Sequence, residues 1–158
     1  MAVVQPTDFA LAAELREQGF EIVCCPEDQN GLGASLAFGV RVTGGSIGWL
    51  VSLADMPYIK PKTAQTIAAH LRKGVIIVAP YFAGRRGHPV GFGRALGPQL
   101  GALTGDAGAV ALIKSHRHLL VKVPCDDAGV LFDIDTPEDL AAAHGALNLQ
   151  HTPVRLRL

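Results

Sequence analysis

Acidic residues in two segments of the chain have the type and position needed to bind a metal ion. Asp55 lies two residues after the largely apolar run 47–53, and Asp133 and Asp135 stand on either side of Ile134. Side chains alternate along an extended chain, so Asp133 and Asp135 project to the same side. Carboxylates in such places bind Mg²⁺, and phosphate oxygens complete its coordination shell. The alternatives are that Asp55 stabilises a turn and that Asp135 assists the cap of a following helix.

Two further segments have the composition of anion-binding loops. Residues 31–36 (Gly-Leu-Gly-Ala-Ser-Leu) run into a predicted helix, whose first N–H groups could face an anion. The stretch matches neither GxGxxG nor a P-loop, so a plain glycine turn is the alternative. Arg85 and Arg86 could bind phosphate through bidentate hydrogen bonds. Equally, they could lie at the solvated tip of a hairpin.

The sequence around these segments predicts alternating strands and helices. Apolar runs indicate strands at 3–4, 22–24, 47–53, 75–78, 119–123 and, as a further candidate, 131–134. Helices are predicted over 8–19, 34–42, 61–74, 105–115 and from Thr136 onward, with a loop or hairpin over 81–93. This alternation favours an α/β fold with a doubly wound, mostly parallel sheet. Ligands of such sheets bind beyond the carboxyl ends of the strands.

Three other acidic residues receive structural interpretations. Asp106 stands at the start of the predicted helix 105–115, where an aspartate is most simply a cap. Asp126 and Asp127 are adjacent and most simply form a solvated turn. No function is therefore expected of these three residues.

Composition limits the class of protein. The 158 residues are 49% hydrophobic and 18% charged, which suits one domain, placed at 1–145 with a C-terminal tail at 146–158. Lys+Arg and Asp+Glu both number 14, so charge gives no reason to expect nucleic acid or an anionic membrane as a partner. Apolar runs stay below the roughly 18 residues of a membrane span, and the N-terminus lacks the features of a signal peptide. Three cysteines without zinc-ligand spacing indicate reduced thiols in a cytoplasmic protein.

Taken in order, five segments resemble the MobA-like nucleotidyltransferases, and most closely the molybdenum cofactor cytidylyltransferase branch. They are 31–36, 53–57, 84–92, 104–109 and 131–140. The resemblance implies a Rossmann-like fold of the nucleotide-diphospho-sugar transferase type. It also implies transfer of CMP from CTP to the phosphate of molybdopterin, with release of pyrophosphate and with Mg²⁺ as cofactor.

The same resemblance implies a role for individual residues. Asp55 and Asp133 would be catalytic and, with Asp135, would hold Mg²⁺. The nucleotide would be bound by Gly31, Gly33, Ser35 and Asp55. The acceptor would be bound by Arg86, Gly87, His88 and Pro89. Phosphoryl chemistry of this kind depends more on positioning and charge neutralisation than on a covalent catalyst.

The sequence departs from the family at its beginning. Family members open with a strand and a glycine-rich loop, roughly LAAGxSxRMGxxK, that wraps the triphosphate, and no such segment occurs here. Val3 and Val4 look like the family's second strand, so we expect the first βα unit to be absent and a strand to be missing from the middle of the sheet. The exposed edge could pair with a second copy in a homodimer. Ala54 replaces the glycine that usually precedes Asp55.

These departures leave two main hypotheses. The first is the Mg²⁺-dependent cytidylyltransferase, with little activity in the chain as it stands. The second is a non-catalytic protein of the same fold that binds a nucleotide or a partner chain. An oxidoreductase, a function carried by some relatives, ranks last because no GxGxxG is present.

Overall fold

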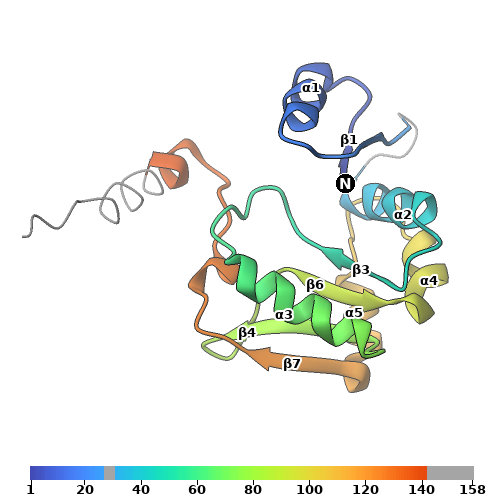
Figure 1. The fold of residues 1–158 in the computed structure, drawn as a ribbon, viewed down its shortest axis with the longest axis vertical. Coiled ribbons are helices and arrows are strands. Elements are labelled where there is room, and N and C mark those ends of the chain that lie inside the picture. The colour runs from blue at the N-terminus through green and yellow to red at the C-terminus, as the bar shows by residue number, and fades with distance from the viewer. Residues whose placement is uncertain (27–30, 142–158) are drawn as a thin grey trace, which may run out of the picture.

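The computed structural model describes residues 1–26 and 31–141, so the predicted tail 146–158 lies outside the described residues. Strands and helices alternate along the chain (Figure 1). The strands are β1 (Ala2–Val4), β2 (Ile22–Cys24), β3 (Gly48–Val51), β4 (Ile77–Phe82), β5 (Arg85–Arg86), β6 (Val90–Gly93) and β7 (Leu120–Pro124). The α-helices are α1 (Phe9–Glu17), α2 (Leu32–Val42), α3 (Pro61–Arg72), α4 (Gly97–Gly101) and α5 (Val110–Ser115). Among these residues, no helix has the length and apolar character needed to cross a membrane.

The central strand of the larger sheet is β4, which extends beyond the predicted 75–78. Its start pairs antiparallel with β6 and its end pairs antiparallel with β5, while its other edge pairs in parallel with β7. Because β3 is antiparallel to β6, it runs in the same direction as β4 and β7. The predicted α/β class is confirmed, and the antiparallel strands β5 and β6 come from the segment predicted as a loop or hairpin.

A second sheet contains only β1 and β2 in the described part of the chain. These two strands pair in parallel, with Val3 opposite Val23, and they do not join the larger sheet. Within the described residues, β1 and β3 are thus each hydrogen-bonded along one edge only. Helix α2 packs on β1, close enough that a Cβ built on Gly39 would lie 3.1 Å from Cγ2 of Val3.

The buried side chains of β4 alternate between two cores. Ile77 and Ala79 belong to a cluster with residues of α2, α4 and α5, whereas Val78 packs with Ile67 and Leu71 of α3. Successive side chains of a strand point to opposite faces of its sheet, so α3 covers one face and the other helices cover the opposite one. Figure 1 shows α3 in front of β4 and β6. The structure therefore has helices on both faces of the sheet, as the sequence predicts.

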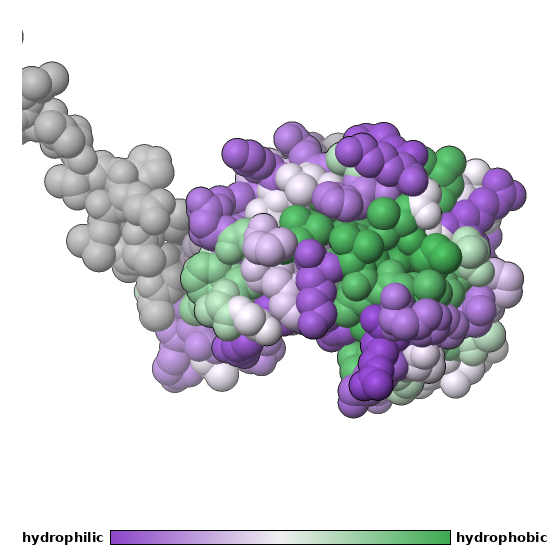
Figure 2. Space-filling view, turned by 90° about the horizontal axis from the view of Figure 1, so that it is seen from below, coloured by the Kyte–Doolittle hydropathy of each residue, from purple (hydrophilic) through white to green (hydrophobic). Residues whose placement is uncertain are grey.

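Edge strand β7 lies at the bottom of Figure 1. Seen from below, apolar side chains gather in the middle of the surface and polar ones surround them (Figure 2). Val121 of β7 is 38% exposed, and its neighbour Lys122 is exposed and charged. Lysine on an edge strand hinders its pairing with another chain.

The predicted helix 105–115 begins only at Val110, and Asp106 does not cap it. Asp106 instead approaches the start of α2, where a Cβ built on Gly31 would lie 2.5 Å from its Oδ1. A carboxylate is favoured near the positive N-terminus of a helix. The prediction that Asp106 caps the helix 105–115 is therefore wrong. Its side chain lies instead at the start of α2, a helix far away in the sequence.

The candidate strand 131–134 does not form, because Leu131 ends a 3₁₀ helix (Ala128–Leu131) and residues 132–134 have no regular structure. Ile134 donates its backbone N–H to the carbonyl of Asp55 at 2.9 Å, a single bond rather than a ladder. The helix predicted from Thr136 is present over 137–141. It starts with a reciprocal cap, in which Thr136 donates to the carboxylate of Asp139 and the N–H of Asp139 donates to Oγ1 of Thr136.

Asp127 is buried, so the prediction of a solvated turn is wrong for this residue. Its Oδ2 accepts hydrogen bonds from the backbone N–H of Lys60 at 2.9 Å and from the hydroxyl of Thr63 at 2.6 Å. Its Oδ1 accepts from the N–H of Gly129 at 3.1 Å. The carboxylate thus fastens the segment after β7 to the start of α3. Asp126 beside it is exposed.

We expect the two adjacent aspartates to differ sharply in their contribution to stability. Asp127→Ala removes a charged acceptor from three donors and should lower the free energy of unfolding by about 3 kcal/mol. Asp126→Ala, the matched control, should change it by less than about 0.5 kcal/mol. Urea unfolding followed by circular dichroism measures both. Equal losses in the two variants would contradict the assignment.

Candidate active site

The segments that carry Asp55 and Asp133 lie side by side. The bond from the N–H of Ile134 to the carbonyl of Asp55 joins them directly beyond the end of β3. Both aspartates are exposed, and both raise the pKa of His88 through their charge. The structure therefore brings together two acids that are far apart in the sequence.

A loop after β5 holds His88 near these acids. The N–H of Gly87 donates to the carbonyl of Pro80 at 2.8 Å, and the N–H of His88 donates to the carbonyl of Val130 at 2.9 Å. Gly87 packs so tightly that a Cβ built on it would lie 2.5 Å from Cγ2 of Val130. The peptide bond from His88 to Pro89 is cis. These contacts fix the backbone of the predicted acceptor loop.

The side chain of His88 is half-buried, and its Nδ1 has no hydrogen-bond partner among the described residues. Burial lowers the pKa of His88 from its ordinary value of 6.5, and the charge of Arg86 lowers it further. A hydrogen bond with the Val51 backbone and the charges of Asp55 and Asp133 oppose this shift. Burial prevails, so His88 is neutral at pH 7. Arg86, His88 and the two acids thus form one electrostatic group.

The donor set fits a hard cation held jointly with a ligand. The described residues contain no group of three or more His, Cys, Asp or Glu side chains able to hold a metal ion. Mg²⁺, however, is commonly bound through one or two carboxylates, with phosphate oxygens and water as its other ligands. Asp55 and Asp133 supply two such groups. Asp135 is exposed, donates its N–H to the carboxylate of Asp139, and is not among the charges that act on His88.

The predicted nucleotide loop is engaged with another part of the chain. The N–H groups of Gly33 and Ala34, at the start of α2, donate to the carbonyl of Gly105 at 2.7 and 3.3 Å. The N–H of Ser35 donates to the carbonyl of Gly31 at 3.0 Å. Within the described ranges, no hydrogen bond connects this loop to the segment of Asp55. The hydrogen bonds of this loop therefore lead to the segment of Gly105 and not to the acids.

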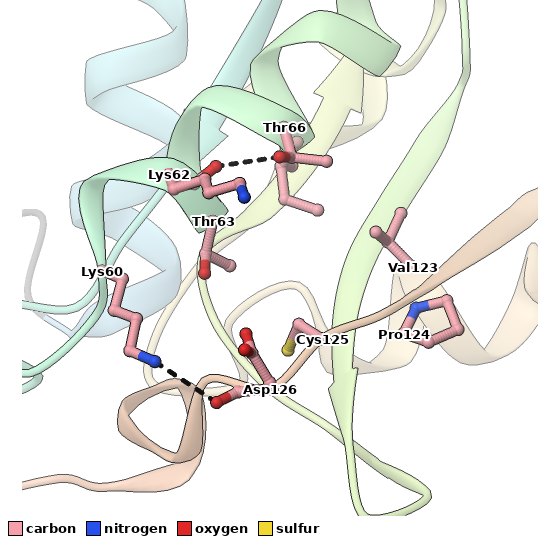
Figure 3. A pocket seen from close by; sticks show the side chains of 9 residues that line it. Lys60, Lys62, Thr63, Thr66, Val123, Pro124, Cys125 and Asp126 are labelled. Carbon is pink, nitrogen blue, oxygen red and sulfur yellow. Dashed lines mark hydrogen bonds between the residues drawn. The ribbon is translucent and has the colours of Figure 1, made fainter.

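Two cavities lie near these segments, and neither is lined by Asp55 or Asp133. The first, of about 460 Å³, lies between the start of α3 and the end of β7 (Figure 3). The second, of about 370 Å³, has Arg86 in its wall together with Lys114 and Arg117. The last two residues belong to no motif. No pattern in the sequence marks them, because Lys114 belongs to α5 and Arg117 to the 3₁₀ helix Arg117–Leu119 that follows it.

A mixed sheet with helices on both faces defines an α/β protein, and ligands of this class of protein bind beyond the carboxyl ends of the strands. Residues 1–120 match the model of the MobA-like NTP transferase domain, and the chain belongs to this family.

Two relatives of known name extend this result. The chain is 28% identical over 138 residues to nicotine blue oxidoreductase of Paenarthrobacter nicotinovorans, covering 83% of this chain and 68% of the relative. It is 30% identical over 127 residues to the purine catabolism protein PucB of Bacillus subtilis (strain 168), covering 78% of this chain and 61% of PucB. The chain thus spans about two thirds of the length of these relatives.

Solved structures share the fold. Rv0371c of Mycobacterium tuberculosis H37Rv is 26% identical, with a TM-score of 0.72 over 89% of this chain and 73% of its own. Its complex with manganese is 27% identical, with a TM-score of 0.69 over the same shares. Molybdopterin-guanine dinucleotide biosynthesis protein A of Archaeoglobus fulgidus, at 19% identity and a TM-score of 0.63 over 93% of this chain and 78% of its own, shows a likeness of fold alone.

His88 should make the stability of the chain depend on pH. Since the folded-state pKa lies below the ordinary 6.5, the unfolded chain binds the proton more readily. The stability that neutral His88 provides is present above pH 6.5 and is lost as the pH falls through the folded-state pKa. We expect thermal unfolding between pH 7.5 and pH 5 to show a shallower pH dependence in His88→Gln. His118→Gln, which changes an exposed histidine, should keep the original slope, and equal slopes in all three proteins would refute the expectation.

Proposed function

We propose that this chain provides the metal-binding and acceptor-binding side of a Mg²⁺-dependent nucleotidyltransferase. Its reaction is the transfer of CMP from CTP to the phosphate of molybdopterin, with release of pyrophosphate. The observation that carries the proposal is the convergence of Asp55, Asp133, His88 and Arg86 in one electrostatic group. Family membership and the manganese complex of a relative support it.

The reaction joins two phosphates. An oxygen of the acceptor phosphate attacks the α-phosphorus of CTP and forms a new P–O bond. The bond from that phosphorus to the oxygen bridging to the β-phosphate breaks, and pyrophosphate leaves with the electron pair. When Mg²⁺ is bound, it neutralises charge on the triphosphate and on the leaving pyrophosphate. Positioning and charge neutralisation therefore account for most of the catalysis.

The residues of this chain divide these tasks. Asp55 and Asp133 would hold Mg²⁺, with Asp135 on the same segment as Asp133. Arg86 would donate charge-assisted hydrogen bonds to the acceptor phosphate. His88, kept neutral by burial, offers a ring nitrogen for hydrogen bonding without adding a positive charge beside the metal ion. The loop of Gly87 and Pro89 keeps this imidazole in place.

Replacement of one acid should remove the metal dependence of nucleotide binding. Asp55→Asn keeps the shape of the side chain but loses the charge, so the affinity for CTP with Mg²⁺ should fall about tenfold or more. The affinity without Mg²⁺ should stay the same, and so should the thermal unfolding curve. Calorimetric titration with CTP and with GTP, each with and without Mg²⁺, measures this effect.

Asp126→Asn is the matched control, because Asp126 is exposed and is not among the charges that act on His88. Its metal dependence should equal that of the unchanged chain. If Asp55→Asn also keeps the full effect of Mg²⁺, the metal assignment is wrong. Tighter binding of GTP than of CTP would refute the cytidylyl preference.

One observation favours a second candidate, a non-catalytic protein that binds a nucleotide or a partner chain. The N–H groups of Gly33 and Ala34 are occupied by the carbonyl of Gly105, so they are not available to neutralise a triphosphate. Preorganised N–H donors are a large part of the stabilisation of developing charge in enzymes.

We therefore expect little or no turnover by the 158-residue chain on its own. Pyrophosphate release from CTP with molybdenum-loaded molybdopterin is the assay, and a full-length cytidylyltransferase of the family is the positive control. Turnover comparable to that control would show that other groups replace the occupied donors and would favour the enzyme over the binding protein.

A further inference from the structure

His88 connects the two segments that carry the acids of the candidate site. Asp55 lies in the segment 51–55, which leaves β3, and Asp133 lies in the segment 130–134, which comes after β7. Figure 1 shows the chain after β7, drawn in orange, beside the loop that leads from β3 to α3. The spacing of the two carboxylates therefore depends on what joins these two segments.

The ring of His88 is bonded to the first segment. It makes a hydrogen bond with the backbone of Val51, the last residue of β3. Nδ1 has no partner among the described residues, so this bond belongs to Nε2. The bond raises the pKa of His88, as a ring N–H that donates to a carbonyl oxygen does. A neutral imidazole has one N–H, and here it is therefore on Nε2.

The backbone of His88 is bonded to the second segment. Its N–H donates to the carbonyl of Val130 at 2.9 Å. The N–H of Ile134 then donates to the carbonyl of Asp55 at 2.9 Å, which joins the second segment back to the first. These three hydrogen bonds close a circuit, called here the His88 circuit, that runs from His88 through both segments and returns to it. Each segment of the circuit contains one of the two acids.

The sheet does not guide the chain beyond β3, so the circuit has to do so. The ladder between β3 and β6 ends at the pair of Val51 and Val90. In the part of the chain that the structure describes, residues 52–54 make no backbone hydrogen bond to another segment. The course of the chain toward Asp55 is thus set at its two ends, by the ring of His88 and by the N–H of Ile134.

The segment 130–134 is attached to the rest of the fold independently of His88. The carboxylate of Asp127 fastens the chain just before it to the start of α3. Within it, the ring of Phe132 packs edge to face on that of Tyr58, with the centroids 5.4 Å apart. This segment is therefore a firm support on which His88 can hold the end of β3.

His88 lies close to both acids without binding either of them. The charges of Asp55 and Asp133 act on its ring, and the energy of such an interaction falls with distance. Among the described residues, its hydrogen bonds go to Val51 and Val130 and not to a carboxylate. The ring is thus placed to hold the two acids in position rather than to act as a ligand beside them.

We propose that His88 is the positioning residue of the metal site, because it sets the spacing at which Asp55 and Asp133 share one divalent cation. The metal site rests on the proposed function, whereas the His88 circuit does not. Residues that orient metal ligands without touching the metal commonly contribute about tenfold or more to metal affinity. The bond from the ring to Val51 is therefore expected to strengthen metal binding from outside the coordination shell.

Two amide variants that differ in reach test this role in the intact chain. The side-chain amide of glutamine extends about as far as Nε2 of histidine, whereas that of asparagine ends about where Nδ1 lies. His88→Gln should therefore keep the bond to Val51, and His88→Asn should lose it. His118→Asn is the matched control, because His118 is an exposed histidine outside the circuit.

Amide hydrogen exchange measures the circuit without any ligand. The N–H of Ile134 makes no contact with the ring of His88, so its exchange rate reports on how closely the two segments are held together. Loss of the bond to Val51 should speed this exchange about tenfold in His88→Asn. The rate should stay the same in His88→Gln and His118→Asn. The amides of β4 should keep their rates in all three variants, which shows that the fold is intact.

Calorimetric titration with CTP measures the metal site. The factor by which Mg²⁺ raises the affinity for CTP should fall about tenfold in His88→Asn. It should be retained in His88→Gln and in His118→Asn. Rescue by glutamine separates the bond to Val51 from the imidazole itself, because both variants lack the imidazole.

Three results would overturn the proposal. The first is an unchanged exchange rate of Ile134 in His88→Asn, and the second is a loss of the Mg²⁺ effect in His88→Gln as large as that in His88→Asn. The third is faster exchange of Ile134 with the full Mg²⁺ effect, because spacing would then not govern the metal. If Mg²⁺ has no effect on CTP binding by the unchanged chain, the proposed function fails. The expected exchange rates would in that case still establish His88 as the residue that spaces the two segments.

Discussion

Hydrogen bonding along both edges of β4 is the constraint on which the rest of the structure depends. Ile77–Pro80 are buried, with β6 and then β5 on one edge and β7 on the other. The turn into β5 gives the chain the loop of Arg86 and His88. The parallel pairing with β7 carries the chain to Asp127 and to Val130, whose carbonyl holds the N–H of His88. One strand therefore positions both the cations and the backbone that supports them.

Local signals predicted much of the fold, because they act over a few residues. Pro61 opens α3, the apolar run 22–24 forms β2, and Thr136 with Asp139 caps the last described helix. Asp126 and Asp127 show the limit of such signals. The two residues are chemically identical, and only one is buried, because the start of α3 approaches it from more than sixty residues away.

The candidate site, like the fold, could be predicted only in part from the sequence. Motifs in the sequence pointed to Asp55, Asp133 and the loop 86–89, and the structure brings these segments together. The loop 31–35 is instead hydrogen-bonded to Gly105, whose carbonyl occupies the N–H groups of Gly33 and Ala34 that an anion would need. Lys114 and Arg117 carry no motif, since their position beside Arg86 arises from the packing of α5 against the sheet.

The contact of α2 with Gly105 has a consequence for how the sequence can change. A Cβ on Gly33 would lie 2.8 Å from the carbonyl oxygen of Gly105 and 2.9 Å from that of Thr104, and Gly31 has a φ of +101° that few other residues adopt. Any side chain at either glycine must displace the backbone of the other segment. The segments 31–33 and 104–105 are some seventy residues apart in the sequence. A substitution in one is thus expected to be tolerated only when the other segment changes with it.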